Sequence, residues 1–105
     1  MIDPEKAEKA SEFLRVSAKT LADLWQLTRD AEADTENTEA LLVKEYHVNG
    51  VPATICRSYA RADERWVTKK TLEARAFANL KGLEARREAA KIAISLYQSE
   101  VKDRI

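Results

Sequence analysis

Helix-breaking residues divide this chain into two long, uninterrupted stretches. Neither proline nor glycine occurs between Pro4 and Gly50, and after Pro52 the only such residue is Gly82. Proline and glycine end helices and form the corners of many-turned β-sandwiches and barrels. A chain of 105 residues is also short for two domains. We therefore expect an all-α protein with one helical domain over residues 1–105.

The first stretch has the pattern of an amphipathic helix over about residues 4–47. Asp3 is a suitable N-cap, Pro4 fits a first helical turn, and Glu5 favours the positive end of the helix dipole. Apolar side chains then recur at steps of three and four: Leu14, Ala18, Leu21 and Trp25. The acidic, threonine-rich segment 30–38 predicts that the helix loosens or breaks there.

The dipeptide Asn49-Gly50, followed by Pro52, predicts a turn over about residues 48–53. Two structures fit this turn. In one, Gly50 adopts a left-handed conformation and ends the first helix. In the other, the flanking segments 41–48 and 51–57 form a small β-hairpin around a type I′ turn. The sequence leaves both open.

The second stretch predicts a helix over about residues 54–105, with Thr54 or Ser58 as its cap. Its apolar positions recur at steps of three or four up to Trp66 and of three, four or seven from Leu72 onward, and Gly82 is the expected kink. Arg87 interrupts this seam where an apolar residue is expected. The apolar seam comprises Ile55, Tyr59, Ala62, Trp66, Leu72, Ala76, Leu80, Leu83, Ala90, Ile94, Tyr97, Val101 and Ile105.

Two helices folded back at the turn form a long antiparallel hairpin or coiled coil, which buries one seam only. Phe77, Ile92 and Leu96 lie off that seam, so we expect self-association into an oligomeric helical bundle. The predicted oligomer interface comprises Leu72, Leu80, Leu83, Arg87, Ile94, Tyr97 and Val101.

The formal net charge of zero conceals two halves of opposite sign. Residues 1–50 hold six basic and eleven acidic side chains, whereas residues 51–105 hold twelve basic and seven acidic ones. The basic excess is densest at Arg57, Arg61, Arg65, Lys69 and Lys70, a set that we call the basic row. The first four of these recur every four residues, so one helix would carry them on one face.

The basic row has two interpretations that the spacing alone does not separate. Cations about 6 Å apart along a helix, together with Tyr59 and Trp66, match the phosphates and bases of a single strand. Alternatively, a hairpin turning near residue 50 places Glu39 opposite about position 61 and Asp34 opposite about position 66. The acidic side chains between Asp30 and Glu39 and the cations of the basic row would then neutralise each other as surface ion pairs.

Several classes of protein and site are not expected. No apolar run is long enough for a membrane span, and the N-terminal segment lacks the apolar core of a secretory signal. Cys56 has no second cysteine to pair with, so a reducing cytoplasmic setting is expected. His47 and Cys56 are too few ligands for a zinc site. We therefore expect no cofactor, no metal and no enzymatic activity.

One family resemblance covers roughly residues 40–105. A helix closing on Glu45-Tyr46-His47-Val48-Asn49-Gly50 precedes a charged helix that opens with Tyr59-Ala60-Arg61-Ala62-Asp63-Glu64 and ends in Glu100-Val101-Lys102-Asp103-Arg104. This arrangement resembles the UvsY-like recombination mediators of bacteriophages, small helical proteins that oligomerise and help load a recombinase onto single-stranded DNA. The resemblance implies a nucleic-acid accessory protein whose basic residues near 57–70 contact DNA. The alternative is a structural or protein-binding helical module, such as an adaptor, a scaffold or an inhibitor of a host protein.

Overall fold

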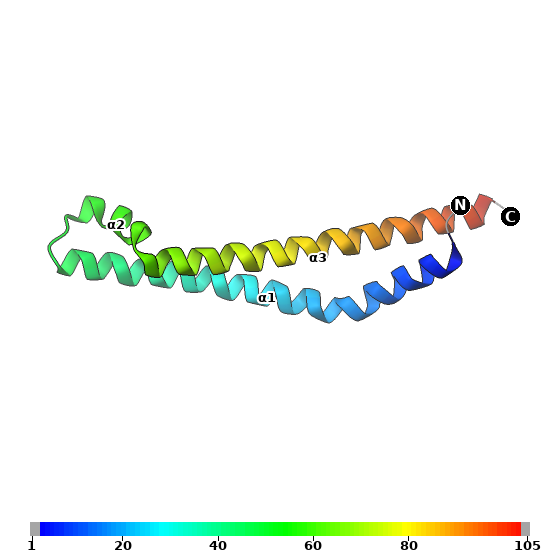
Figure 1. The fold of residues 1–105 in the computed structure, drawn as a ribbon, viewed down its shortest axis with the longest axis horizontal. Helices are drawn as coiled ribbons and strands as arrows, with labels where there is room; N and C mark the ends of the chain where they lie inside the picture. Colours follow the sequence, from blue (N-terminus) through cyan, green and yellow to red (C-terminus); the bar gives the residue numbers. More distant parts are fainter. Residues whose placement is uncertain (1–2, 104–105) are drawn as a thin grey trace. The chain divides into compact units, whose positions relative to one another are not determined.

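A computed structural model describes residues 3–103 of the chain. It contains the helix α1 (Pro4–Val48), a 3₁₀ turn η1 (Ala53–Ile55), the short helix α2 (Cys56–Ala62) and the helix α3 (Glu64–Asp103), as Figure 1 shows. No strand occurs among residues 3–103. The all-α prediction is therefore confirmed, and the last two residues of the predicted second helix lie outside the described residues.

The helix α1 begins at Pro4, directly after the predicted cap Asp3, and ends at Val48, close to the predicted end at about residue 47. The backbone N–H of Glu5 donates to Asp3 Oδ1 over 2.9 Å, so the aspartate caps the helix. The predicted loosening over residues 30–38 is wrong, because α1 runs through this segment without a break. The buried Thr35 hydroxyl donates to the Ala31 carbonyl oxygen over 2.9 Å, so the helix itself satisfies this polar side chain.

Of the two structures that the sequence allowed for the turn after α1, the chain adopts the one in which Gly50 ends the helix. Gly50 has a φ of 96°, its N–H donates to the His47 carbonyl, and the Val51 N–H donates to the Tyr46 carbonyl. These two bonds and the left-handed glycine define a Schellman cap. The segments around it form helix and 3₁₀ turn in place of the β-hairpin.

The predicted single helix over 54–105 is wrong, because the chain breaks at Asp63. This residue is extended, with φ −73° and ψ 137°. Its N–H donates to the Ala60 carbonyl and closes α2, while its side-chain Oδ1 accepts the Arg65 N–H over 2.9 Å and opens α3. The helix α2 has no side-chain cap from Thr54 or Ser58, and α3 continues as helix through Gly82.

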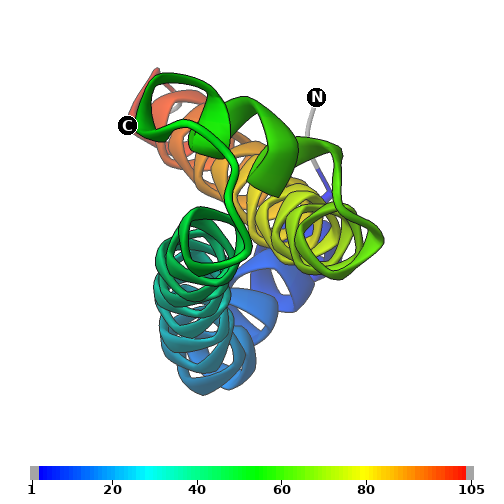
Figure 2. The same cartoon turned by 90° about the vertical axis from the view of Figure 1, so that its left-hand side faces the viewer.

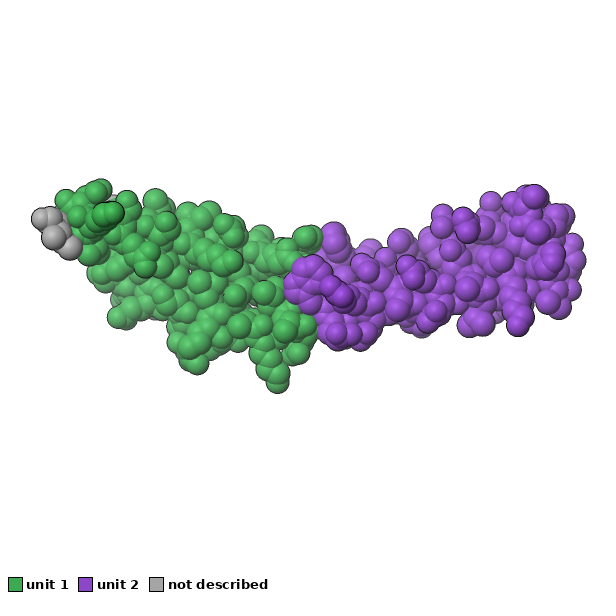
Figure 3. Space-filling view, turned by 180° about the vertical axis from the view of Figure 1, so that it is seen from behind, with its two compact units in different colours: residues 1–24, 79–105 green, residues 25–78 purple. Residues whose placement is uncertain are grey.

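The chain forms two compact units, which Figure 3 colours separately. Unit 1 comprises residues 1–24 and 79–105, and unit 2 comprises residues 25–78. In unit 2, Glu39 pairs with Arg61 and Asp34 with Lys69, so the chain on the two sides of the turn runs in opposite directions. Figures 1 and 2 show α2 as a separate short segment beside the C-terminal end of α1.

The core of the described chain is small. Most of the side chains on α1 that are buried or half-buried recur at alternating steps of three and four, which is the heptad pattern of a coiled-coil seam. Seven of the eleven residues of this seam are Ala, Ser or Thr, and the other four are Leu: Ala7, Ala10, Leu14, Ser17, Leu21, Leu24, Thr28, Ala31, Thr35, Thr38 and Leu42. The seam thus passes through Leu24 and leaves Ala18 and Trp25, which the sequence pattern placed in it, exposed. The buried hydrophobic residues are Ala7, Leu42, Cys56, Ala60, Leu80 and Leu83.

Candidate nucleic-acid interface

The basic row lies on two helices instead of one. Arg57 and Arg61 belong to α2, and the other three cations belong to α3, beyond the break at Asp63. The break interrupts the four-residue periodicity, because the backbone at Asp63 is extended. The five cations therefore do not form the continuous helical face that their spacing predicted.

Two cations of the row pair with the acidic segment of α1. Arg61 Nε donates to Glu39 Oε1, so the predicted juxtaposition of position 39 with position 61 is confirmed. Lys69 Nζ lies 2.8 Å from Asp34 Oδ2, three residues beyond the predicted position 66. These side chains are partly exposed, and ion pairs of this kind contribute at most about 1 kcal/mol each.

Arg65 is the most fully engaged cation of the row. Its Nη1 and Nη2 atoms donate to the two carboxylate oxygens of Glu45 over 2.9 and 3.2 Å, and its Nη2 and Nε also contact Asp63. Asp63 in turn accepts the Tyr46 hydroxyl over 2.8 Å. One aspartate thus connects α1 with the start of α3.

This cluster shifts the protonation of its members. Hydrogen bonds from the Arg65 side chain and backbone, and then from Tyr46, hold the pKa of the Asp63 carboxyl well below its usual range. Hydrogen bonds to the carboxylates of Asp63 and Glu45 raise the pKa of Arg65. The hydrogen bond that the Tyr46 hydroxyl donates to Asp63 raises the pKa of Tyr46. At neutral pH the cluster holds one cation between two carboxylates.

The last two cations differ in how far they are neutralised. Lys70 Nζ lies 3.3 Å from Glu73 Oε1, one turn along α3, and the other carboxylate oxygen of Glu73 is buried without a hydrogen-bond partner among the described residues. Arg57 is exposed and has no ion-pair or hydrogen-bond partner within residues 3–103. Of the basic row, Arg57 alone is thus without a polar partner in this part of the chain.

The two predicted stacking residues lie in different environments. The Tyr59 side chain is 48% exposed, and its ring meets Tyr46 edge-on at a centroid distance of 5.7 Å. Trp66 is half-buried, with the Arg61 guanidinium 5.9 Å from its ring centroid. Trp66 therefore packs within unit 2, whereas part of Tyr59 faces solvent.

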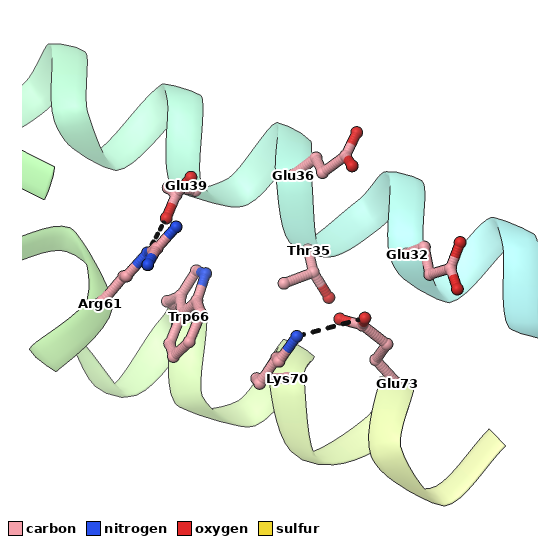
Figure 4. Close-up of a pocket in the computed structure, with 8 residues that line it drawn as sticks. All are labelled: Glu32, Thr35, Glu36, Glu39, Arg61, Trp66, Lys70 and Glu73. Atoms are coloured by element: carbon pink, nitrogen blue, oxygen red, sulfur yellow. Dashed lines mark hydrogen bonds and ion pairs between the residues drawn. The ribbon is translucent and has the colours of Figure 1, made fainter. Parts of the chain in front are cut away.

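A cavity of about 340 Å³ lies beside these groups in unit 2. Figure 4 shows Trp66 and Lys70 facing α1 across it, with Arg61 held by Glu39 at one end and Glu36 pointing away from Trp66. Both charge signs contribute to its lining: Glu32, Thr35, Glu36, Glu39, Arg61, Trp66, Lys70 and Glu73. A hollow whose carboxylates outnumber its cations does not favour a polyanion.

The predicted oligomer-interface residues are divided by burial. Leu80 and Leu83 are buried within the chain, Leu72 and Val101 are exposed, and Ile94 and Tyr97 are half-buried. Arg87 is half-buried and donates from Nη1 to the Leu14 carbonyl oxygen over 2.8 Å and to Ser17 Oγ over 2.6 Å. The interruption of the apolar seam at Arg87 is thus filled from the chain's own α1.

The sequence patterns did not predict the roles of Asp63 and Ser17. Asp63 followed by Glu64 has the pattern of a helix start, an N-cap with an acidic first turn, and that pattern was the available signal. Ser17 had no such signal, because its role depends on Arg87 far along the chain. His47 and Cys56 each approach the Val51 carbonyl oxygen at 3.4 Å.

Within residues 3–103 no group of three or more histidine, cysteine, aspartate and glutamate side chains is placed to hold a metal ion. No helix in the same range is long and apolar enough to cross a membrane.

Comparison of the chain with protein-family models, curated proteins and solved structures found no match. The resemblance to UvsY-like mediators thus stays a prediction.

Proposed function

We propose that this chain is a non-enzymatic structural module of the cytoplasm, a helical hairpin of the coiled-coil type that acts by self-association and by contacts with proteins. The observation that carries the proposal is the imbalance between buried and exposed apolar side chains in unit 2. Its buried hydrophobic residues are Leu42, Cys56 and Ala60. Its exposed large ones are Trp25, Leu27, Leu41, Val48, Ile55, Tyr59, Val67, Leu72 and Phe77. Apolar side chains left uncovered in this way gain free energy when another protein surface removes them from water.

The electrostatics of unit 2 support a protein partner over a phosphate backbone. Residues 25–78 hold nine acidic and eight basic side chains, and carboxylates of the same chain already contact four cations of the basic row. A nucleic-acid strand binding there would meet these fixed carboxylates as well as the cations. Affinity for phosphates depends on cations that are free to replace counterions, so this surface offers little of it.

Single-stranded nucleic acid is the second candidate ligand, and one observation favours it. Arg57 lacks a polar partner among residues 3–103, and the exposed Tyr59 lies two residues along α2. An unpaired cation and an exposed ring are two elements that a single-strand site uses, although two residues apart on a helix they lie on different faces of α2. In an oligomer such elements repeat, so this candidate also depends on self-association.

The proposal is tested by sedimentation velocity of the full chain over a wide range of protein concentration, with a fluorescent single-stranded oligonucleotide present at low salt. We expect the protein to sediment faster as its concentration rises, while the oligonucleotide sediments alone. A protein that remains an 11.9 kDa monomer at every concentration contradicts the proposal.

The same experiment decides the second candidate through the Arg57→Ala variant. If the oligonucleotide co-sediments with the wild type and not with Arg57→Ala, the nucleic-acid function replaces the structural one. Arg75→Ala is the matched control, because Arg75 is an exposed cation of unit 2 outside the basic row.

A further inference from the structure

The outer face of α3 within unit 1 carries a second seam. Its members are spaced at alternating steps of three and four, as in the seam that faces α1, but they lie on the opposite side of the helix. All are exposed: Gly82, Ala85, Ala89, Ile92, Leu96 and Ser99. Ile92 and Leu96 are 53% and 54% exposed, and charged side chains are the usual occupants of such a face. The packing within residues 3–103 therefore leaves this seam uncovered.

Gly82 has no explanation within the chain. The helix continues through it, its φ is not positive, and an added Cβ would meet no atom within 4 Å. A glycine inside a helix lowers its stability relative to alanine. Its position on the second seam supplies a reason, because small residues on a helix face let another helix approach closely.

The seam has small residues at Gly82, Ala85 and Ala89, large ones at Ile92 and Leu96, and a small one again at Ser99, and this order indicates what covers it. We propose that a second copy of this chain covers the seam, with the two α3 helices antiparallel about a two-fold axis that passes between Ala90 and Lys91. Leu96 of each copy then lies opposite Ala85 of the other, Ile92 opposite Ala89, and Ser99 opposite Gly82. Each large side chain thereby meets a small one, which is the complementarity that close packing requires. This inference rests on the proposed self-association and assigns it to unit 1, which leaves the exposed apolar side chains of unit 2 for contacts with other proteins.

The flanking charges fit the same arrangement. Arg86, which has no carboxylate partner among the described residues, comes within reach of Glu100 of the second copy, a residue that also has an interaction within its own chain, and the symmetry makes this contact twice. Side chains lean toward the N-terminus of their own helix, so in antiparallel helices these two lean toward each other. Like charges meet at the two ends of the pair, where Lys81 of one copy approaches Lys102 of the other. This repulsion is reduced because Lys81 Nζ lies 3.2 Å from Glu84 Oε2 of its own chain.

A parallel pair in register fits less well. Gly82, Ala85 and Ala89 would then face their own copies and leave a gap, while Ile92 and Leu96 would hold the helices apart. Lys81 of one copy would also approach Arg86 of the other, the usual flanking contact of a parallel pair. The antiparallel arrangement is therefore the one that this pattern favours.

The test uses disulfide formation between full chains, in a Cys56→Ala background whose helical content matches that of the wild type. One preparation carries Gly82→Cys and the other carries Ser99→Cys, so every large side chain of the seam is retained. Under mild oxidation we expect a covalent dimer in the mixture and none in either preparation alone. In the proposed pair, two copies of the same engineered position lie more than about 20 Å apart along the axis, beyond the reach of a disulfide.

A second pair of variants tests independently whether this face of α3 is needed for self-association. Ala89→Asp places a charge in the seam, and Ala22→Asp places the same charge on an exposed position of α1. We expect Ala89→Asp to reduce self-association at least tenfold and Ala22→Asp to leave it unchanged, with the helical content of both preserved.

The outcomes separate this inference from the proposed function. Cross-linking within a single preparation means a parallel pair and overturns the inference. Self-association without cross-linking in the mixture, or undiminished by Ala89→Asp, overturns this surface and leaves the proposed function standing. A wild-type chain that is monomeric throughout overturns both.

Discussion

At the scale of single residues, Asp63 determines where the second half of the chain bends. It closes α2 through its backbone N–H, caps α3 through its carboxylate, and accepts the Tyr46 hydroxyl from α1. An asparagine retains the shape and one acceptor oxygen but loses the charge that binds Arg65. The role of Asp63 therefore depends on its ionised form.

The depressed pKa of Asp63 predicts how its contribution varies with pH. A carboxyl whose folded-state pKa lies below its unfolded value stabilises the fold fully above the unfolded pKa, near 4, and loses that contribution as the pH falls further. We expect the melting temperature of Asp63→Asn to lie below that of the wild type between pH 5 and 7, with the gap shrinking below about pH 4. Thermal unfolding followed by circular dichroism measures both. A gap that does not change with pH would show that the charge of Asp63 has no part.

Arg87 is the second residue whose contacts lead to a prediction. Its guanidinium bonds the Leu14 carbonyl and the Ser17 hydroxyl inside unit 1. Hydrogen bonds from a charged donor contribute about 1.5–3 kcal/mol, so we expect Arg87→Ala to lower the free energy of unfolding by about 2 kcal/mol. Urea unfolding measures the loss. Arg75→Ala, at an exposed cation, should be nearly neutral, and equal losses in both variants would contradict the assigned role.

At the scale of elements, the two glycines differ in what they do. Gly50 has a φ of 96° at the end of α1, whereas Gly82 has helical geometry inside α3. An alanine at position 50 is strained and should cost about 1 kcal/mol, while an alanine at position 82 should add about 1 kcal/mol through its higher helix propensity. Urea unfolding at a concentration where the chain is monomeric tests both signs. The same sign for both changes would contradict the two assignments.

Local chemistry made part of this fold predictable. The Asp3 cap and the all-α class depend on residues that are neighbours in the sequence, and each could be predicted from them, whereas the Gly50 cap was one of two structures that the sequence left open. The continuity of α1 through residues 30–38 could not, because it depends on Thr28 and Thr35 being buried in a seam. A polar pattern gives no sign that a hydroxyl will bond its own helix.

The candidate site was predictable only as far as its residue types. The complementarity of the acidic and basic segments, and the pairing of Glu39 with Arg61, follow from the position of the turn. The division of the basic row between two helices does not, because it follows from the extended backbone at Asp63. The sequence placed Asp34 opposite about position 66, whereas in the structure Asp34 pairs with Lys69. This shift follows from the same break at Asp63, which the sequence pattern did not predict.

At the scale of the whole molecule, the oppositely charged halves of the chain form ion pairs with each other. The acidic excess of the first half lies where it can meet the basic excess of the second, and three ion pairs join them: Glu39 with Arg61, Glu45 with Arg65 and Asp34 with Lys69. The charge asymmetry that suggests a polyanion partner is thus used within the chain. Neutralisation of the basic row by carboxylates of α1 leaves the chain little affinity for a polyanion.

Its most direct test is the affinity for a labelled single-stranded oligonucleotide, measured by fluorescence anisotropy over a salt series. The variant Asp34→Asn/Glu39→Gln/Glu45→Gln removes the three carboxylates that face the basic row. The control Glu8→Gln/Asp23→Asn/Glu88→Gln makes the same change in net charge at exposed carboxylates elsewhere. We predict that the wild type and the control do not bind, and that the first variant binds with a log–log salt slope of about −1.4, because Arg61 and Lys69 are freed whereas Arg65 stays bonded to Asp63. Wild-type binding that matches that of the first variant, and is lost in Arg61→Ala/Arg65→Ala, would contradict the neutralisation.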